Sequence, residues 1–189
     1  MIKEEWFAVP IWYDIVEDID IEPLIKEILK METEMPSVEY SNVGGWQSES
    51  NIYEYPTFKP LFEKLQPKVE KAAKEYTGNS ESSVELINAW INVSRAGNYN
   101  RMHSHPGCNF SAVFYLTAPD EKATIKFVRP DFNLISGYEI YGFSNSVNVV
   151  DHVAVPKKLL IFPSWIPHEV EINNSNNPRI SIAVNYASK

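Results

Sequence analysis

The apolar residues in the first third of the chain recur at helical spacing in two segments. Residues 18–32 place leucine and isoleucine side chains along one side of a helix, with Asp20 as its expected cap and Pro23 in its first turn. This stripe consists of Leu24, Ile25, Ile28 and Leu29. The pattern predicts an amphipathic helix that packs the stripe against a core.

A second helical pattern covers residues 57–78. Its apolar side consists of Leu61, Leu65, Val69 and Ala72. Gly78 is the expected end of this helix, because glycine accepts the left-handed backbone that commonly follows a last turn. Pro67 lies inside the pattern and lacks an N–H, so it is predicted to bend the helix or split it in two.

From residue 85 onward, short segments alternate apolar with polar residues or are apolar throughout, and turn residues separate them. They predict strands at 85–95, 111–118, 123–129, 146–155, 158–164, 168–173 and 179–186. Residues 4–16 predict a further strand broken at Pro10, and residues 41–50 predict a loop. Helices followed by seven or eight antiparallel-type strands predict an α+β fold with a double-stranded β-helix (jelly-roll) core and N-terminal supporting helices.

Length and composition narrow the class of protein. The 189 residues are expected to form a single domain, in which residues 1–84 support a β core of residues 85–189. The net charge of −8 disfavours nucleic acid as a partner. A single cysteine, Cys108, excludes an internal disulfide framework and a cysteine-rich zinc site. No apolar run is long enough to span a membrane, so a cytoplasmic protein is expected.

Two of the four histidines stand in the segment NYNRMHSHPGCNF, as His103 and His105. Residues two positions apart on a strand share a face, so these side chains lie close together. His168 begins the predicted strand at 168–173, which a closed β fold can bring beside the first pair. Three such residues could hold a metal with open coordination positions, as in non-haem iron(II) oxygenases. The alternative reading is that the histidines are polar residues on solvated edges.

An arginine opens the last predicted strand, RISIAVNY. Arg179 lies 11 positions after His168, and Ser181 is the next residue on the same face. A guanidinium and a hydroxyl together suit a carboxylate held deep in a barrel. The alternative is an ordinary arginine at a strand start, exposed or paired with an acid.

These residues resemble the motif of the iron(II)- and 2-oxoglutarate-dependent dioxygenase superfamily. The segment SRAGNYNRMHSHPGCNFSAVFYLTAP looks like its prolyl-4-hydroxylase-type core. The stretches SNVGGWQS, IFPSWIPHEV and RISIAVN resemble a branch of 2-oxoglutarate/Fe(II) oxygenases of bacteria and phages, so the resemblance covers about residues 5–187.

The resemblance implies a role for each candidate residue. His103, His105 and His168 would hold iron(II), and Arg179, Ser181 and Tyr115 would bind 2-oxoglutarate. The implied reaction consumes O₂ and 2-oxoglutarate, releases succinate and CO₂, and hydroxylates a C–H bond of a prolyl or other amino-acid residue or of a small metabolite.

His105 departs from the superfamily pattern, which has an aspartate or glutamate at that position. Three-histidine iron sites occur in cupin-type dioxygenases, so two further functions stay open. One is a three-histidine cupin-type metal protein that does not use 2-oxoglutarate. The other is a metal-free jelly-roll protein with a binding or structural role. The substrate and the oligomeric state also stay open.

Two tryptophans and the cysteine are weaker candidates. Trp46 could belong to a lid over the site, although a core position is favoured. Trp165 could line the mouth of the site or anchor a turn, and the two readings are balanced. Cys108 is expected to be a small buried residue and not a ligand.

Overall fold

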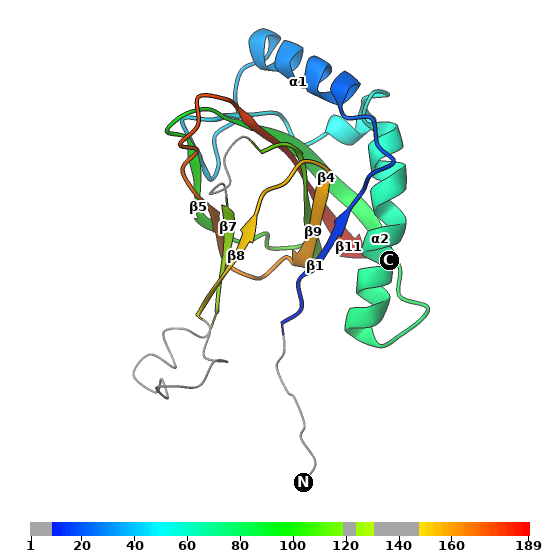
Figure 1. The fold of residues 1–189 in the computed structure, drawn as a ribbon. Coiled ribbons are helices and arrows are strands. Elements are labelled where there is room, and N and C mark those ends of the chain that lie inside the picture. The colour runs from blue at the N-terminus through cyan, green and yellow to red at the C-terminus, as the bar shows by residue number, and fades with distance from the viewer. Residues whose placement is uncertain (1–8, 119–123, 131–147) are drawn as a thin grey trace.

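The computed structural model describes residues 9–118, 124–130 and 148–189. In these residues two antiparallel sheets face each other, and two α-helices lie outside (Figure 1). The helices are α1 (Glu22–Glu34) and α2 (Lys59–Thr77), with a short 3₁₀ helix, η1, at Ile52–Glu54. Predicted strand residues 4–8, 123 and 146–147 lie outside the described residues. None of the described helices is long and apolar enough to cross a membrane.

The larger sheet has six strands in the order β1-β9-β6-β11-β4-β3. Their bounds are β1 (Trp12–Ile15), β9 (Lys158–Pro163), β6 (Phe110–Thr117), β11 (Arg179–Ser188), β4 (Val84–Ser94) and β3 (Trp46–Gln47). The smaller sheet has five strands in the order β2-β5-β10-β7-β8. Their bounds are β2 (Asn42–Val43), β5 (Tyr99–His103), β10 (His168–Val170), β7 (Thr124–Val128) and β8 (Val149–Val153).

The eight strands from β4 to β11 divide equally between the two sheets, which is the jelly-roll arrangement. The predicted double-stranded β-helix core is therefore confirmed, and each of the seven strands predicted between residues 85 and 186 is present. The N-terminal segment supports this core with strands as well as helices. β1 and β3 form the two edges of the larger sheet, and β2 forms one edge of the smaller sheet.

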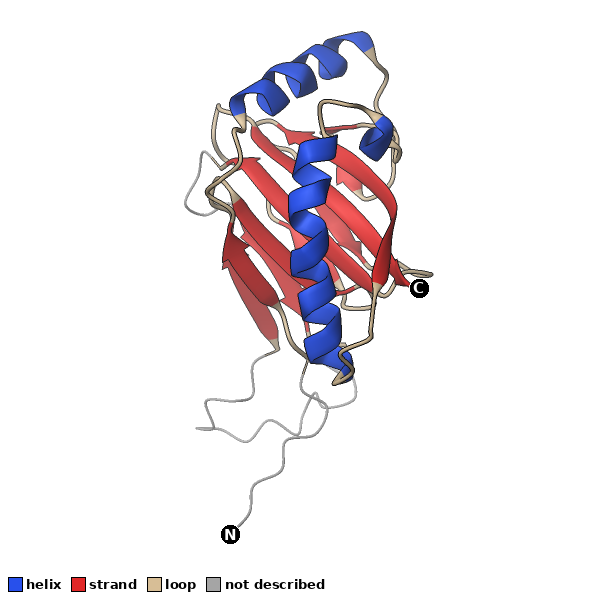
Figure 2. Ribbon diagram, turned by 90° about the vertical axis from the view of Figure 1, so that its right-hand side faces the viewer, coloured by secondary structure: helices blue, strands red, loops and turns tan. Residues whose placement is uncertain are grey.

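Strand alternation gives the larger sheet two chemically different faces. On β11, the apolar residues Ile180, Ile182, Val184 and Tyr186 belong to the main hydrophobic core. That core includes Leu61, Leu65 and Val69 of α2, which lies across the sheet in Figure 2. The intervening residues of β11 face the space between the sheets and line a cavity there, and they are Arg179, Ser181, Ala183 and Asn185.

α2 runs through Pro67 as one helix, so the predicted split does not occur. The apolar residues on both sides of the proline, Leu65 and Val69, are fully buried, and this packing outweighs the lost backbone hydrogen bond. Because proline has no N–H, the carbonyl group four positions before Pro67 loses its helical partner. Pro67 is exposed, so this carbonyl group lies near water. Gly78 ends the helix with φ +66°, as predicted.

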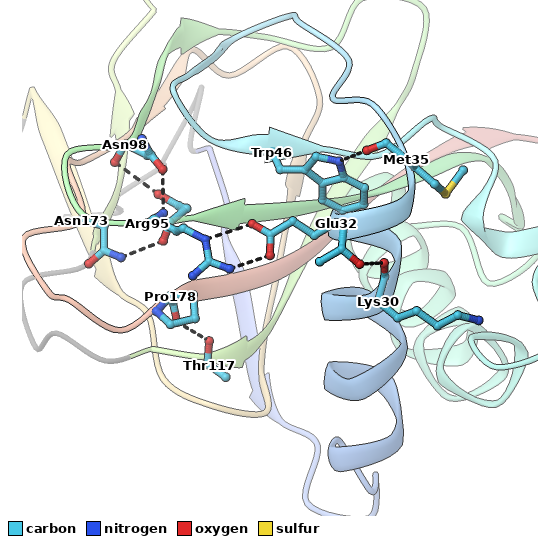
Figure 3. Close-up of polar contacts among 11 residues, drawn as sticks. Lys30, Glu32, Met35, Trp46, Arg95, Asn98, Thr117, Asn173 and Pro178 are labelled. Atoms are coloured by element: carbon cyan, nitrogen blue, oxygen red, sulfur yellow. Dashed lines mark hydrogen bonds and ion pairs between the residues drawn. The ribbon is translucent and has the colours of Figure 1, made fainter.

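The segment between the helices is tied to the core by polar contacts (Figure 3). The indole Nε1 of Trp46 donates to the Met35 carbonyl at 3.0 Å, and Trp46 is buried, so its core reading is confirmed. The Arg95 guanidinium, just beyond β4, binds Glu32 of α1 through two hydrogen bonds of 3.0 and 2.6 Å. The predicted loop at 41–50 contains β2 and β3, joined through Gly44 with φ +74°.

Candidate metal centre

The fold brings the three predicted histidines together between the sheets. His103 ends β5, His168 begins β10, and the two residues are direct partners in the antiparallel pairing of these strands. His105 follows two positions after His103. One ring nitrogen from each histidine lies within 4.8 Å of the other two, and the Nε2 atoms of His105 and His168 are 3.2 Å apart.

A bulge in β5 lies directly beside the pair of His103 and His168. His103 pairs with His168 and Asn100 pairs with Val170, so two residues of β5, Arg101 and Met102, stand opposite the single residue between His168 and Val170. In a regular strand, residues three positions apart point to opposite faces. Because of the extra residue, Asn100 and His103 both line the interior cavity.

Backbone carbonyl groups fix the rings of two histidines. The His103 Nδ1–H donates to the Arg101 carbonyl at 2.7 Å, and the His168 Nδ1–H donates to the Ile166 carbonyl at 2.9 Å. A carbonyl only accepts, so Nδ1 carries the proton and Nε2 keeps its lone pair. Hydrogen bonds of this kind typically orient metal-ligating histidines.

The donor set fits a transition metal. Two imidazole nitrogens bound at right angles to one metal, each at about 2.1 Å, would lie about 3 Å apart. The 3.2 Å between His105 Nε2 and His168 Nε2 matches this spacing. Imidazole nitrogen suits iron, zinc, copper and nickel, and the group consists of histidines alone.

A buried polar network behind His105 was missed from the sequence. Asn185 Nδ2 lies 3.4 Å from His105 Nδ1 and donates to Asn88 Oδ1 at 2.9 Å, while Ser111 Oγ donates to Asn185 Oδ1 at 2.7 Å. The His105 backbone N–H donates to the Ser164 carbonyl at 2.9 Å. The signal for Asn185 was its position on the same face of RISIAVN as Arg179 and Ser181.

The three imidazoles are held in their neutral form. Burial lowers the pKa of His103, and burial together with the neighbouring histidines lowers the pKa of His105 to about 4 and of His168 to about 3. Neutral imidazole is the form that binds a metal, so the group is ready for a cation near neutral pH.

Arg179 is buried, with 3% of its surface exposed, at the start of β11. Its Nη2 donates to Ser94 Oγ at 3.1 Å and to the Glu171 carbonyl at 2.9 Å. Thr117 holds the backbone on both sides of Arg179. Its hydroxyl donates to the Pro178 carbonyl at 2.7 Å (Figure 3), and it accepts from the Ile180 N–H at 2.9 Å.

Ser181 and Tyr115 are direct partners between β11 and β6, and both are buried. Burial raises the pKa of the Tyr115 hydroxyl, and the positive charge of Arg179 acts against that rise. The phenol is therefore neutral and close enough to the guanidinium to feel its charge.

One interior cavity of about 50 Å³ is lined by all six predicted site residues: His103, His105, His168, Arg179, Ser181 and Tyr115. The weaker candidates lie elsewhere. Trp165 is 46% exposed and lines a different surface depression together with Cys108. The remaining histidine, His152, lies outside the metal-compatible group and contacts the rings of Tyr13 and Phe127.

The sequence matches the model of a protein family described as "Putative 2OG-Fe(II) oxygenase" over residues 88–185, which is more than half of the chain. This region contains every residue of the histidine group and Arg179, Ser181 and Tyr115. No curated protein sequence matches the chain significantly.

Solved structures with the same fold share little sequence identity with it. A prolyl-4-hydroxylase from Pseudomonas putida is 13% identical, with a TM-score of 0.66 and coverage of 95% of this chain and 93% of the other. The 2-oxoglutarate-dependent epimerase SnoN of nogalamycin biosynthesis is 15% identical, with a TM-score of 0.70 and coverage of 94% and 77%. HygX from Streptomyces hygroscopicus, solved with nickel and 2-oxoglutarate, is 12% identical, with a TM-score of 0.63 and coverage of 95% and 83%.

The lowered histidine pKa values predict how stability depends on pH. The unfolded chain binds protons at these histidines below about pH 6.5 and the folded chain does not, so the free energy of unfolding falls as pH decreases below 6.5. His168 alone should contribute a slope of about 1.4 kcal/mol per pH unit. Urea unfolding with a chelator present, between pH 7 and pH 4.5, should show a flatter dependence for His168→Gln than for the wild type. Parallel curves would contradict the burial of a neutral His168.

Asn185 is predicted to support metal binding through His105. Asn185→Leu removes the amide beside the imidazole, so the affinity for zinc(II), measured by calorimetry, should fall about tenfold. Asn92→Leu is the matched control, because Asn92 lines the same cavity from β4 and its amide oxygen has no hydrogen-bond partner among the described residues. Equal losses in both variants would show a general packing defect instead of a role for Asn185.

Proposed function

Because the chain belongs to the 2OG-Fe(II) oxygenase family, whose cofactors are iron(II) and 2-oxoglutarate, we propose that it hydroxylates a C–H bond of a small molecule or an amino-acid residue. In this proposal His103, His105 and His168 hold the iron. Arg179, Ser181 and Tyr115 bind 2-oxoglutarate. The observation that carries the proposal is that all six side chains line one cavity.

The bound iron and 2-oxoglutarate supply the oxidising chemistry, in which O₂ is consumed and succinate and CO₂ are released. The protein contributes binding and orientation. Arg179 offers a fixed guanidinium fork to the distal carboxylate, and the hydroxyl groups of Ser181 and Tyr115 offer further hydrogen bonds. Apolar side chains such as Val113, Ile125 and Phe162 line the same cavity and limit the access of water.

Arg179 distinguishes this function from the two alternatives. A cupin-type protein that works without 2-oxoglutarate needs the histidines but has no need of a buried guanidinium in the same cavity. A metal-free jelly-roll protein needs neither. The Arg179 guanidinium lines the same cavity as the histidines, so a dicarboxylate co-substrate bound there would meet a fixed positive charge.

Replacing Arg179 should separate co-substrate binding from metal binding. In Arg179→Ala the affinity for 2-oxoglutarate should fall at least about tenfold, because charged hydrogen bonds contribute about 1.5–3 kcal/mol each. Zinc(II) affinity should stay unchanged, because the Arg179 guanidinium hydrogen-bonds to Ser94 Oγ and to the Glu171 carbonyl, which do not belong to the histidine group. The measurement is an anaerobic titration with Fe(II) and then 2-oxoglutarate, following the visible charge-transfer band.

Arg95→Ala is the control for this titration, because Arg95 is an arginine directly after β4 that pairs with Glu32 outside the cavity. If Arg179→Ala binds 2-oxoglutarate as well as the wild type, the assignment of Arg179 is wrong. Iron binding without the band in the wild type would favour the cupin-type function, and the absence of iron binding would favour a metal-free role.

His105 occupies the position where the superfamily has an acid, so it can be tested by exchange. His105→Ala should lower the Fe(II) affinity, since one of three ligands is lost. His105→Asp should still bind Fe(II), because a carboxylate restores the usual facial triad. Unchanged affinity in His105→Ala would make His105 a bystander, and loss of iron in His105→Asp would require a different ligand geometry.

A further inference from the structure

A wide groove opens directly onto the metal centre. It has a volume of about 560 Å³, against about 50 Å³ for the interior cavity, and the two share Ser41, Trp90, His103, His105 and Asn185. Clefts of 300–1,000 Å³ usually hold small-molecule ligands. The interior cavity suits a small co-substrate, and the groove is the space left for the molecule that is oxidised.

The lining of the groove is polar but contains no acid among the described residues. It offers four hydroxyl groups, three amides, two histidines, Trp90, Met102 and one permanent cation, Arg101. The chain as a whole has 25 aspartates and glutamates against 17 lysines and arginines. The groove therefore differs from the rest of this acidic protein, because its described lining has a cation and no acid. An anion that enters it meets less electrostatic repulsion than elsewhere on the surface.

The bulge in β5 places Arg101 at this groove. The Arg101 backbone is fully used: its N–H donates to the Ser41 carbonyl at 2.9 Å, and its carbonyl accepts from His103 Nδ1 at 2.7 Å. Its side chain is exposed and lines the groove. The residue that orients a histidine through its backbone thus also lines the groove beside the metal centre, and it lines the neighbouring surface depression that contains Glu169 and Glu171.

The centre itself adds to the attraction for anions. The histidine group contains no carboxylate, so no anionic side chain of this group offsets the charge of a bound divalent metal. Trp90 lies between this centre and the groove, with its ring 5.4 Å from the His105 ring. It offers an apolar surface to the part of the substrate next to the metal.

We propose that the substrate is a small molecule with a carboxylate or phosphate group, and that Arg101 binds this group while the body of the molecule packs against Trp90. The amides of Gln47 and Asn88 line the same groove and hydrogen-bond to polar groups on the body. This inference rests on the proposed function for the chemistry performed. The preference of the groove for anions stands on its own residues.

Three probes of similar size test the preference: phenyl phosphate, phenylacetate and benzyl alcohol. Each is titrated into the ¹⁵N-labelled full-length protein, once without metal and once with saturating zinc(II) and 2-oxoglutarate, and amide shifts report the affinity. In both conditions at least one anion should bind about fivefold more tightly than benzyl alcohol, the advantage expected for an exposed ion pair of about 1 kcal/mol. Phosphate and carboxylate are distinguished by which anion binds more tightly.

Arg101→Gln should remove this fivefold advantage and leave the binding of benzyl alcohol unchanged. Arg95→Gln is the matched control and should keep the advantage, because Arg95 lies outside the groove. Equal binding of the three probes, no anion binding, or an advantage that survives Arg101→Gln would overturn the inference.

The two conditions separate this inference from the proposed function. If 2-oxoglutarate displaces the anions, they occupy the Arg179 pocket, so the inference fails while the proposed function stands. If 2-oxoglutarate does not bind but the anions still depend on Arg101, the groove assignment stands and the proposed hydroxylase function fails.

Discussion

The pairing of β5 with β10 is the contact on which the site depends. It sets His103 opposite His168, although the two residues are far apart in the chain, and the bulge beside this pair turns Asn100 and His103 to the same side. A shift of one residue in this register would turn His168 away from the cavity, because side chains alternate between faces. The rest of the fold holds that register in place, because β10 is too short to do so alone.

The larger sheet supplies the rigidity. Its outer face is closed by α2 and carries the main hydrophobic core, while its inner face carries the polar residues of the cavity. Because both faces belong to the same strands, burial of Ile180 and Ile182 on β11 fixes the positions of Arg179 and Ser181. Packing of the core therefore fixes where the polar groups of the same strands lie. Those polar groups need not stabilise the fold themselves.

The sequence was sufficient for the elements whose patterns are strong, and insufficient where geometry depends on register. Alternation predicted the strands of the jelly roll, and the histidine spacing predicted a convergent group, because both rest on period-two geometry. β5 was expected only as a strand or strand end carrying the histidine pair, without bounds of its own, since YNRMH is polar and its bulge breaks the alternation. Asn185 was missed because its contact with His105 requires knowing how β11 aligns with its neighbours and where the segment after β5 lies. Of the two expectations at Pro67, a bend or a split of the helix, the split does not occur, because tertiary packing overrides local propensity.

His105 has a physical consequence for the site as a whole. A carboxylate at this position would offset one unit of a bound metal's charge, whereas an imidazole offsets none. Asn185, which approaches the ring at Nδ1, is neutral as well, so the buried surroundings do not restore the missing negative charge. Such a centre would gain from anionic ligands, both from the dicarboxylate co-substrate proposed for the interior cavity and from the anion proposed for the groove. The exchange of an acid for a histidine and the acid-free lining around Arg101 therefore favour the same kind of ligand, although they lie on different parts of the chain.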